Sequence, residues 1–243
     1  PVTAAGFPRS GSPHLCHDAD PFDEAGDLIH QPSRCVYTLS SKRVVSMGKS
    51  IEPVRMYFAL RSPYSWMATE RIAQEGIEID PVAFIMPPAD TPPPNPISSP
   101  AKGAYVARDV VRLSKRLGFA FVLPDPFDID FSRPNNVFQL AKEEDRPLPF
   151  MLAAYRARFV EGRNISEDDV LCDIAVEAGI DPDATLVAAD SIDLRARSLM
   201  ELEKTLEIDR PFGVPFFVYQ GEPFWGQDRI DLLLETVRNS PEA

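Results

Sequence analysis

The sequence predicts an α/β fold interrupted by a large all-helical insertion, and three features of the chain carry that prediction. A strand, a helix and a second strand are expected between residues 54 and 84. The pattern of residues 104–208 favours a succession of helices. The chain then ends in a hairpin and a helix over residues 215–238. Two halves of one α/β unit therefore flank the helical block.

The first α/β half is defined by a hydrophobic run and by helix-capping signals. Val54–Leu60 is a continuous run of β-prone residues, typical of a buried strand. Ser62 before Pro63 predicts a helix with Ser62 at the N-cap, and Gly76 predicts its end. Glu78–Phe84 supplies the second strand of a βαβ unit.

The middle of the chain begins with a proline-rich crossover and continues as helices. Residues 81–100 contain eight prolines, which excludes a helix there. Periodicity and capping residues predict helices over Ala104–Gly118, Asn135–Asp145, Pro149–Gly162, Ser166–Gly179, a short one from Asp181, and Ser191–Ile208. Ser166 with Asp169 is a capping pattern for the fourth of these helices. Cys172 falls among apolar neighbours, so we expect a buried structural thiol.

The second α/β half is a hairpin followed by a helix. Pro215–Tyr219 and Glu222–Trp225 are β-prone and are separated by the turn residues Gln220 and Gly221. Arg229–Arg238 carries apolar residues at helical spacing. The expected order is therefore β-β-α at the end of the chain.

The scarcity of histidine and cysteine excludes most common catalytic sites. All three histidines and two of the three cysteines lie within residues 1–46, and Cys172 is the only cysteine after Met47. A domain starting near Met47 therefore has no Ser-His-Asp triad, no Cys-His pair, no dithiol and no histidine-bound zinc. We expect no metal site. A single thiol also argues against a disulfide framework, which favours a reducing cytoplasm.

Charge and composition limit the partners and divide the chain. The formal net charge of −12 argues against bulk nucleic-acid binding, and no apolar run is long enough for a membrane span. Residues 1–46 lack a sustained apolar period, which predicts a disordered or non-native leader. We expect a discontinuous α/β domain over residues 50–92 and 208–243, with an inserted helical domain over residues 100–207.

Two separated motifs and the helical middle carry a family resemblance. The order of elements, with Gly213-Val214-Pro215 directly before the third strand, resembles a thioredoxin-like fold with a helical insertion. The chain resembles the 2-hydroxychromene-2-carboxylate isomerase family in three places. These are Tyr57-Phe58 with Ser62–Trp66, the Tyr155–Arg163 segment, and Phe212–Arg229. This family is close kin of kappa-class glutathione transferases within the DsbA-like thioredoxin superfamily. The resemblance covers about residues 53–238.

The resemblance implies a glutathione-dependent isomerase of aromatic-compound catabolism. Redox relatives carry the cysteines of a CxxC motif where this chain has Ser62 and Ser65, so dithiol exchange is chemically excluded here. Ser62 is the expected catalytic residue, as a hydrogen-bond donor to the glutathione thiolate at a helix N-terminus. The resemblance also implies a cis bond at Val214-Pro215. It assigns glutathione binding to Ser62, Val214, Trp225, Gly226, Gln227 and Asp228, and substrate binding to Asn95, Pro96 and Asn135.

Simpler structural roles compete with several of these assignments. Ser62 and Asp228 could both be plain helix caps, and Trp225 could belong to the core. Arg61 and Lys102 are candidate charge partners for carboxylates of the substrate or of glutathione, although a plain surface lysine is the favoured interpretation of Lys102.

Two alternative functions remain. A kappa-like glutathione transferase would conjugate electrophiles irreversibly, whereas an isomerase regenerates glutathione as a cofactor. A non-catalytic thioredoxin-fold binding module would keep the shape without the chemistry. Relatives in the family are often homodimers, and no feature of the sequence decides the oligomeric state.

Overall fold

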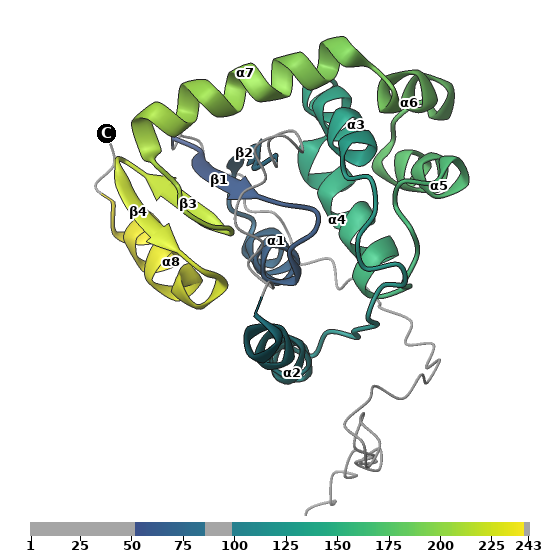
Figure 1. Ribbon diagram of the computed structural model, residues 1–243. Coiled ribbons are helices and arrows are strands. Elements are labelled where there is room, and N and C mark those ends of the chain that lie inside the picture. Colours follow the sequence, from purple (N-terminus) through teal and green to yellow (C-terminus); the bar gives the residue numbers. More distant parts are fainter. Residues whose placement is uncertain (1–51, 86–98, 241–243) are drawn as a thin grey trace, which may run out of the picture. The chain divides into compact units, whose positions relative to one another are not determined.

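The computed structural model describes residues 52–85 and 99–240, and a four-stranded mixed sheet lies at its centre (Figure 1). Its strands are β1 (Val54–Phe58), β2 (Ile79–Ala83), β3 (Phe216–Tyr219) and β4 (Glu222–Trp225), in the order β2-β1-β3-β4. β1 pairs parallel with β2 and antiparallel with β3, and β3 pairs antiparallel with β4. The predicted thioredoxin-like fold with many inserted helices is therefore confirmed.

Helices connect and cover these strands. They are α1 (Pro63–Glu75), α2 (Pro100–Leu117), α3 (Ser132–Glu143), α4 (Pro147–Phe159), α5 (Asp168–Ala178), α6 (Pro182–Ala189), α7 (Ile192–Asp209), the 3₁₀ helix η1 (Gln227–Arg229) and α8 (Ile230–Asn239). Helices α2 to α7 occupy the chain between β2 and β3, as the sequence predicts. No helix in the described ranges combines the length and apolar character that crossing a membrane requires.

Local capping residues set the ends of α1 as predicted. Ser62 has extended backbone angles and its hydroxyl accepts a hydrogen bond from the backbone N–H of Ser65, at 3.2 Å. Gly76 ends the helix in the left-handed conformation, at φ 67°. The start of α1 is therefore fixed directly after β1, at one end of the central strand.

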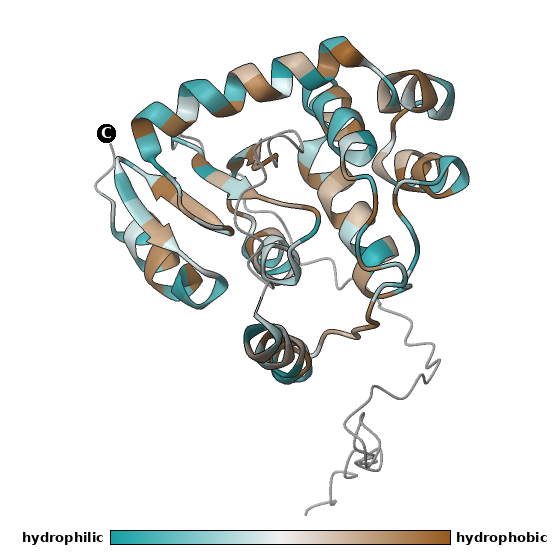
Figure 2. Ribbon diagram, in the orientation of Figure 1, coloured by the Kyte–Doolittle hydropathy of each residue, from teal (hydrophilic) through white to brown (hydrophobic). Residues whose placement is uncertain are grey.

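The sheet packs against α7 through one face of β1. Arg55 and Tyr57 both bind Asp209 at the end of α7, at 2.9 and 2.6 Å. Since side chains alternate along a strand, Met56 and Phe58 point to the opposite face. Figure 2 shows β3 mostly hydrophobic, while α7 alternates between hydrophilic and hydrophobic residues. This alternation fits a helix that covers the core with one side only.

Two predictions on α5 are wrong. The N-cap is Glu167 instead of Ser166, because the amide and hydroxyl of Ser166 bind the side chain of Asn164 in a local turn. Cys172 is only partly buried, because the buried face of the helix is formed by other residues. Those residues are Val170, Leu171, Ile174, Ala175 and Ala178.

Two further predictions concern the division of the chain. The expected leader, residues 1–46, lies outside the described residues. Residues 52–85 and 99–240 belong to one compact unit, which holds both the sheet and the helical insertion. The boundary between a sheet domain and a helical domain stays a prediction.

Candidate active site

The start of α1 presents the Ser62 hydroxyl at a helix N-terminus. The backbone N–H of Ser62 donates to the carbonyl of Ala59 at 2.9 Å, and Trp66 N–H donates to the Ser62 carbonyl at 3.1 Å. The Ser62 oxygen accepts from Ser65 N–H, and no acceptor for the hydroxyl hydrogen occurs among residues 52–85 and 99–240. That hydrogen can therefore be donated to a ligand held at the positive end of the helix dipole.

A buried hydrogen-bond cluster centred on Ala59 supports this turn. The Ala59 carbonyl also accepts from the hydroxyl of Tyr155 on α4 at 3.0 Å, and Ala59 N–H donates to Oγ of Ser65 at 3.4 Å. The side chains of Tyr155 and Ser65 are fully buried. Burial raises the pKa of Tyr155 well above its usual value, so the hydroxyl stays a donor. Ser65 therefore supports the turn from inside, and Ser62 alone of the two serines is accessible.

The start of β3 lies beside this turn. The Val214–Pro215 peptide bond is cis, as the resemblance implies. The antiparallel pairing places Tyr57, near the end of β1, opposite Phe216, the first residue of β3. The chain that leaves β1 and the chain that enters β3 therefore lie at the same end of the sheet. Sequence-distant Ser62 and Val214 are thus carried by adjacent chain segments at the same end of the sheet.

The corner between β4 and η1 holds the other residues assigned to glutathione. Gly226 N–H donates to the Pro215 carbonyl at 2.9 Å, which ties the corner to the start of β3. Gly226 has φ 103°, and a Cβ placed there would lie 2.5 Å from Oδ1 of Asp228. Trp225 is 54% exposed and contacts Phe212 edge to face, so the prediction that it could belong to the core is not favoured.

Asp228 and Gln227 differ in their availability to a ligand. The Asp228 carboxylate is exposed and pairs with Arg229 at 2.6 Å, a surface ion pair that a ligand can replace at little cost. Gln227 is buried, and its backbone carbonyl accepts from Arg71 of α1 at 3.2 Å. This bond holds the corner against α1.

Of the three residues assigned to the substrate, only Asn135 lies within the described ranges. Asn95 and Pro96 lie outside the described residues. Asn135 is 8% exposed on α3, on the face that also carries Phe138, and Phe138 packs against Phe58 with ring centroids 4.8 Å apart. Asn135 therefore lies on the side of α3 that faces the end of β1. Its role stays a prediction.

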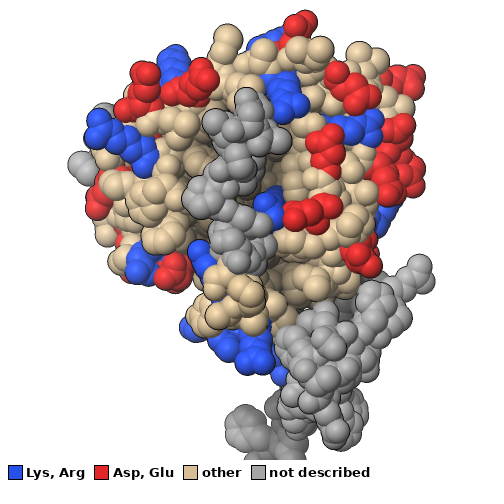
Figure 3. Space-filling model, viewed as in Figure 1, with Lys and Arg blue, Asp and Glu red and all other residues tan. Residues whose placement is uncertain are grey.

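Of the two basic candidates, Arg61 is held close to the site. Its guanidinium binds the exposed carboxylate of Asp128 at 2.7 Å. Lys102 is exposed on α2. Figure 3 shows basic side chains gathered at the end of the molecule where α2 lies, and acidic ones along the side that carries α5 and α6. Since Tyr64 of α1 binds Asp109 of α2 at 2.9 Å, the basic helix adjoins the candidate site.

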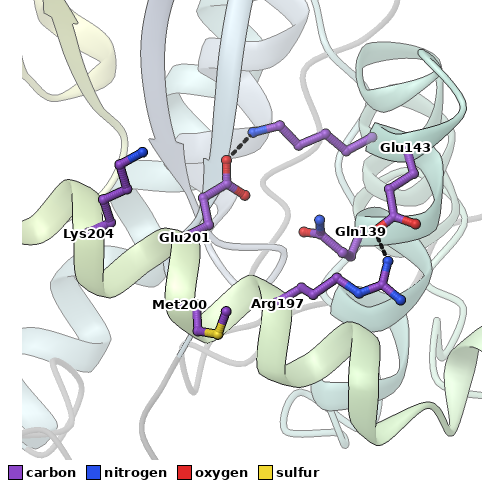
Figure 4. A pocket seen from close by; sticks show the side chains of 7 residues that line it. Gln139, Glu143, Arg197, Met200, Glu201 and Lys204 are labelled. Carbon is purple, nitrogen blue, oxygen red and sulfur yellow. Dashed lines mark hydrogen bonds and ion pairs between the residues drawn. The ribbon is translucent and has the colours of Figure 1, made fainter.

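A hollow of about 410 Å³ between α3 and α7 is unrelated to this site (Figure 4). Its charged side chains neutralise one another, since Lys142 binds Glu201 at 2.5 Å and Arg197 binds Glu143 at 2.6 Å. Four of its seven lining residues are tied up in these two ion pairs, which favours a structural role.

The comparison with protein families identifies the class of this chain. The model of the DSBA-like thioredoxin domain matches residues 53–238, and the chain belongs to that family. The curated relative YwbO of Bacillus subtilis (strain 168), an uncharacterized protein, is 27% identical over 117 residues. That match covers 46% of this chain and spans 56% of the length of YwbO.

Solved structures show the same fold. The structure of a 2-hydroxychromene-2-carboxylate isomerase has a TM-score of 0.67 and 23% identity, over 76% of this chain and 94% of that one. The probable DsbA oxidoreductase SCO1869 from Streptomyces coelicolor has a TM-score of 0.63 and 18% identity, over 79% and 92%. The cytosolic disulfide reductase DsbM from Pseudomonas aeruginosa with GSH has a TM-score of 0.56 and 18% identity, over 77% and 100%.

Proposed function

We propose that the chain is a glutathione-dependent isomerase of the 2-hydroxychromene-2-carboxylate isomerase type, acting on an intermediate of aromatic-compound degradation. The observation that carries the proposal is the Ser62 hydroxyl at the start of α1, whose hydrogen meets no acceptor in the part of the chain that the structure describes. Disulfide exchange at this position would require a cysteine. Cys172, the one cysteine in the described ranges, lies on α5. The reactive thiol is therefore best supplied by a bound molecule.

The start of α1 offers enough electrostatic stabilisation to hold a thiolate. The dipole of a helix N-terminus contributes about 0.3–1 kcal/mol, and up to about 2 kcal/mol in a partly buried site. A hydrogen bond to a charged acceptor adds about 1.5–3 kcal/mol. Lowering a thiol pKa by two units requires about 2.7 kcal/mol. Together, the helix and the Ser62 hydroxyl reach that value.

The neighbouring segments fit the rest of a γ-glutamyl tripeptide. The backbone N–H and C=O of Val214 suit an extended cysteinyl unit, which would pair like an added strand. Asp228 suits the ammonium group of the γ-glutamyl end, while amides near Gln227 suit its carboxylate. The solved DsbM structure with GSH, which shares the fold, supports glutathione as the ligand class.

Bound glutathione would supply a thiolate that adds reversibly to a conjugated carboxylate substrate. The chain contributes the environment: Ser62 orients and stabilises the charge, and Tyr155 and Ser65 hold the turn that carries Ser62. Asn95, Pro96 and Asn135 are the proposed substrate contacts. The structure of a 2-hydroxychromene-2-carboxylate isomerase shares this fold, which supports the choice of isomerisation.

A calorimetric titration of reduced glutathione into the full chain tests the proposal. We expect saturable one-site binding at near-neutral pH, weakened at least tenfold by Ser62→Ala. Ser191→Ala is the matched control, because Ser191 caps α7 with the same 3.2 Å bond that Ser62 makes on α1. Both variants lose a cap worth about 0.5–2 kcal/mol of stability, but only Ser62→Ala is expected to lose affinity. Equal affinity in both variants would contradict the proposal.

Turnover of a hydroxychromene carboxylate distinguishes the alternatives. An isomerase converts the substrate with no net loss of glutathione. Stoichiometric conjugate formation would favour the kappa-like glutathione transferase instead. Glutathione binding without turnover of either kind would favour the non-catalytic module.

A further inference from the structure

Arg158 on α4 is fully buried, at 0% exposed, and no carboxylate of residues 52–85 and 99–240 binds it. Its Nη2 donates to the backbone carbonyl of Phe127. Nε and Nη1 are buried and have no hydrogen-bond partner within the same described ranges. Buried polar atoms without partners are rare in proteins, and a charged group in this state is rarer still. The arrangement suggests that an acceptor joins Arg158 in another state of the protein.

Aromatic rings hold the guanidinium in place without satisfying its N–H groups. Cζ of Arg158 lies 4.8 Å from the ring centroid of Phe131, 5.3 Å from that of Phe159 and 5.6 Å from that of Phe127. Such contacts attract the positive charge to the faces of the rings. The rings provide no oxygen acceptor, so Nε and Nη1 keep their hydrogens for a ligand.

The charged groups around Arg158 leave an excess of positive charge. Arg61 also lies over the ring of Phe127, at 5.9 Å, and Asp128 binds Arg61 with an exposed carboxylate. Among the described residues, these two groups are the charged neighbours that act on Arg158. Burial, followed by the charge of Arg61, lowers the pKa of Arg158 to about 10, so the group is still protonated at neutral pH. Two guanidinium groups thus share one carboxylate.

This cationic pair adjoins the turn that carries Ser62. Arg61 directly precedes Ser62 in the chain. Tyr155, three residues before Arg158 on α4, binds the Ala59 carbonyl of the same turn. Phe159, the residue after Arg158, packs against Trp66 of α1 with ring centroids 5.5 Å apart. The unsatisfied cation therefore lies next to the proposed glutathione site.

We propose that Arg158, together with Arg61, binds the carboxylate of an aromatic acid substrate. The inference rests on the proposed function, because it names the group of the substrate that occupies the same site. A carboxylate supplies the missing negative charge and, in place of the Phe127 carbonyl, accepts from Nε and Nη2 side by side. The rings of Phe127 and Phe131 suit the aromatic body of such a ligand.

Binding requires a local rearrangement of the segment that covers Arg158. Residues 119–131 contain neither helix nor strand, and Phe127 and Asp128 lie within them. A carboxylate that enters takes the place of the Phe127 carbonyl on Arg158 and of Asp128 on Arg61. The Arg61–Asp128 pair is exchanged at little cost, because the Asp128 carboxylate is exposed to solvent and the entering carboxylate replaces it on Arg61.

A pair of probes that differ only in charge tests this assignment. We would titrate 2-hydroxybenzoate and its neutral analogue 2-hydroxybenzamide into the full chain and into the Arg158→Met variant. The wild type is expected to bind the acid at least tenfold more tightly than the amide, and Arg158→Met is expected to abolish the preference. Arg156→Met is the matched control on the same helix, because Arg156 is only partly buried and pairs with Glu177. It should keep the preference.

Equal affinities for the two probes in the wild type, or a preference that survives Arg158→Met, would overturn the inference. If Arg158→Met does not fold, the Nε–H resonance of Arg158 in the wild type replaces it as the readout. That resonance should shift with 2-hydroxybenzoate and not with the amide, and an unchanged resonance would overturn the assignment.

Reduced glutathione, titrated into the same proteins, separates this inference from the proposed function. Glutathione binding without a carboxylate preference contradicts the role of Arg158 alone. A carboxylate preference without glutathione binding contradicts the proposed function alone.

Discussion

The hydroxyl of Tyr155 donates a 3.0 Å hydrogen bond to the carbonyl of Ala59, across a sequence separation of 96 residues. Ala59 begins the turn that places Ser62 at the start of α1, and the same carbonyl accepts from Ser62 N–H. The inserted helical block therefore contacts the turn directly through α4. The position of the Ser62 hydroxyl depends on packing between two parts of the chain that are distant in sequence.

Tyr155→Phe removes this bond while keeping the ring. We expect the free energy of unfolding to fall by about 0.5–1.5 kcal/mol, the usual net value of a hydrogen bond, and glutathione binding to weaken because the turn loosens. Denaturant unfolding and calorimetry measure the two effects. Tyr105→Phe is the control, since the Tyr105 hydroxyl forms only an exposed 3.5 Å bond to Asp109. A Tyr155→Phe variant as stable as the control would refute the supporting role.

Gly226→Ala tests the position of Asp228. Gly221→Ala is its control, because both glycines have positive φ, 103° and 81°, but a Cβ at Gly221 has no atom within 4 Å. Both variants should lose stability, since alanine is strained at positive φ. Only Gly226→Ala displaces the Asp228 carboxylate, and we expect only it to weaken glutathione binding in a titration. Equal binding by the two variants would argue against a role for Asp228.

Ser62→Cys places a thiol of the chain itself at the position where the thiolate of glutathione is proposed to bind. The helix N-terminus should lower the pKa of the introduced thiol by roughly one unit. Cys172 is the internal reference, because burial, followed by nearby aspartates, raises its pKa. Alkylation followed by mass spectrometry should modify position 62 before Cys172. Faster modification of Cys172 would contradict the proposed electrostatics of the site.

Tyr57 makes stability sensitive to alkaline pH. Burial, followed by its bond to Asp209, raises the pKa of Tyr57 from 10.0 to about 12. Because the folded pKa is the higher one, this stabilisation is complete below pH 10 and is lost as the pH rises toward 12. Unfolding free energies across this range should fall less steeply in Tyr57→Phe, by at most about 1.4 kcal/mol per pH unit. An unchanged slope would show that Tyr57 does not titrate as described.

The parts of the fold that could be predicted are those set by local sequence. The ends of α1 follow from Ser62, Pro63 and Gly76, because a capping residue acts within one turn of its own helix. The same reasoning failed at Ser166, where a nearby asparagine competes for the same groups. Cys172 was misplaced because apolar neighbours in sequence do not fix which side of a helix faces the core.

The candidate site could be predicted only where a motif indicated it. The residues at the helix start, at the start of β3 and in the Trp225–Asp228 corner were assigned by resemblance, and their roles stay predictions. Tyr155 and Arg158 could not be assigned a role, because their partners at Ala59 and Phe127 become neighbours only when α4 packs against the sheet. Two arginines in a largely apolar helix, Arg156 and Arg158, were the available signal, and only the structure shows that Arg158 is the buried one.

The most direct test of the central claim is the thiol pKa of glutathione bound to the wild type and to Ser62→Ala. Ultraviolet absorbance of the thiolate, followed against pH at saturating protein, gives both values. The account predicts that the wild type lowers the thiol pKa by about two units, and that Ser62→Ala loses at least half of that shift. An unshifted pKa in the wild type, or an equal shift in both proteins, would contradict the role of Ser62.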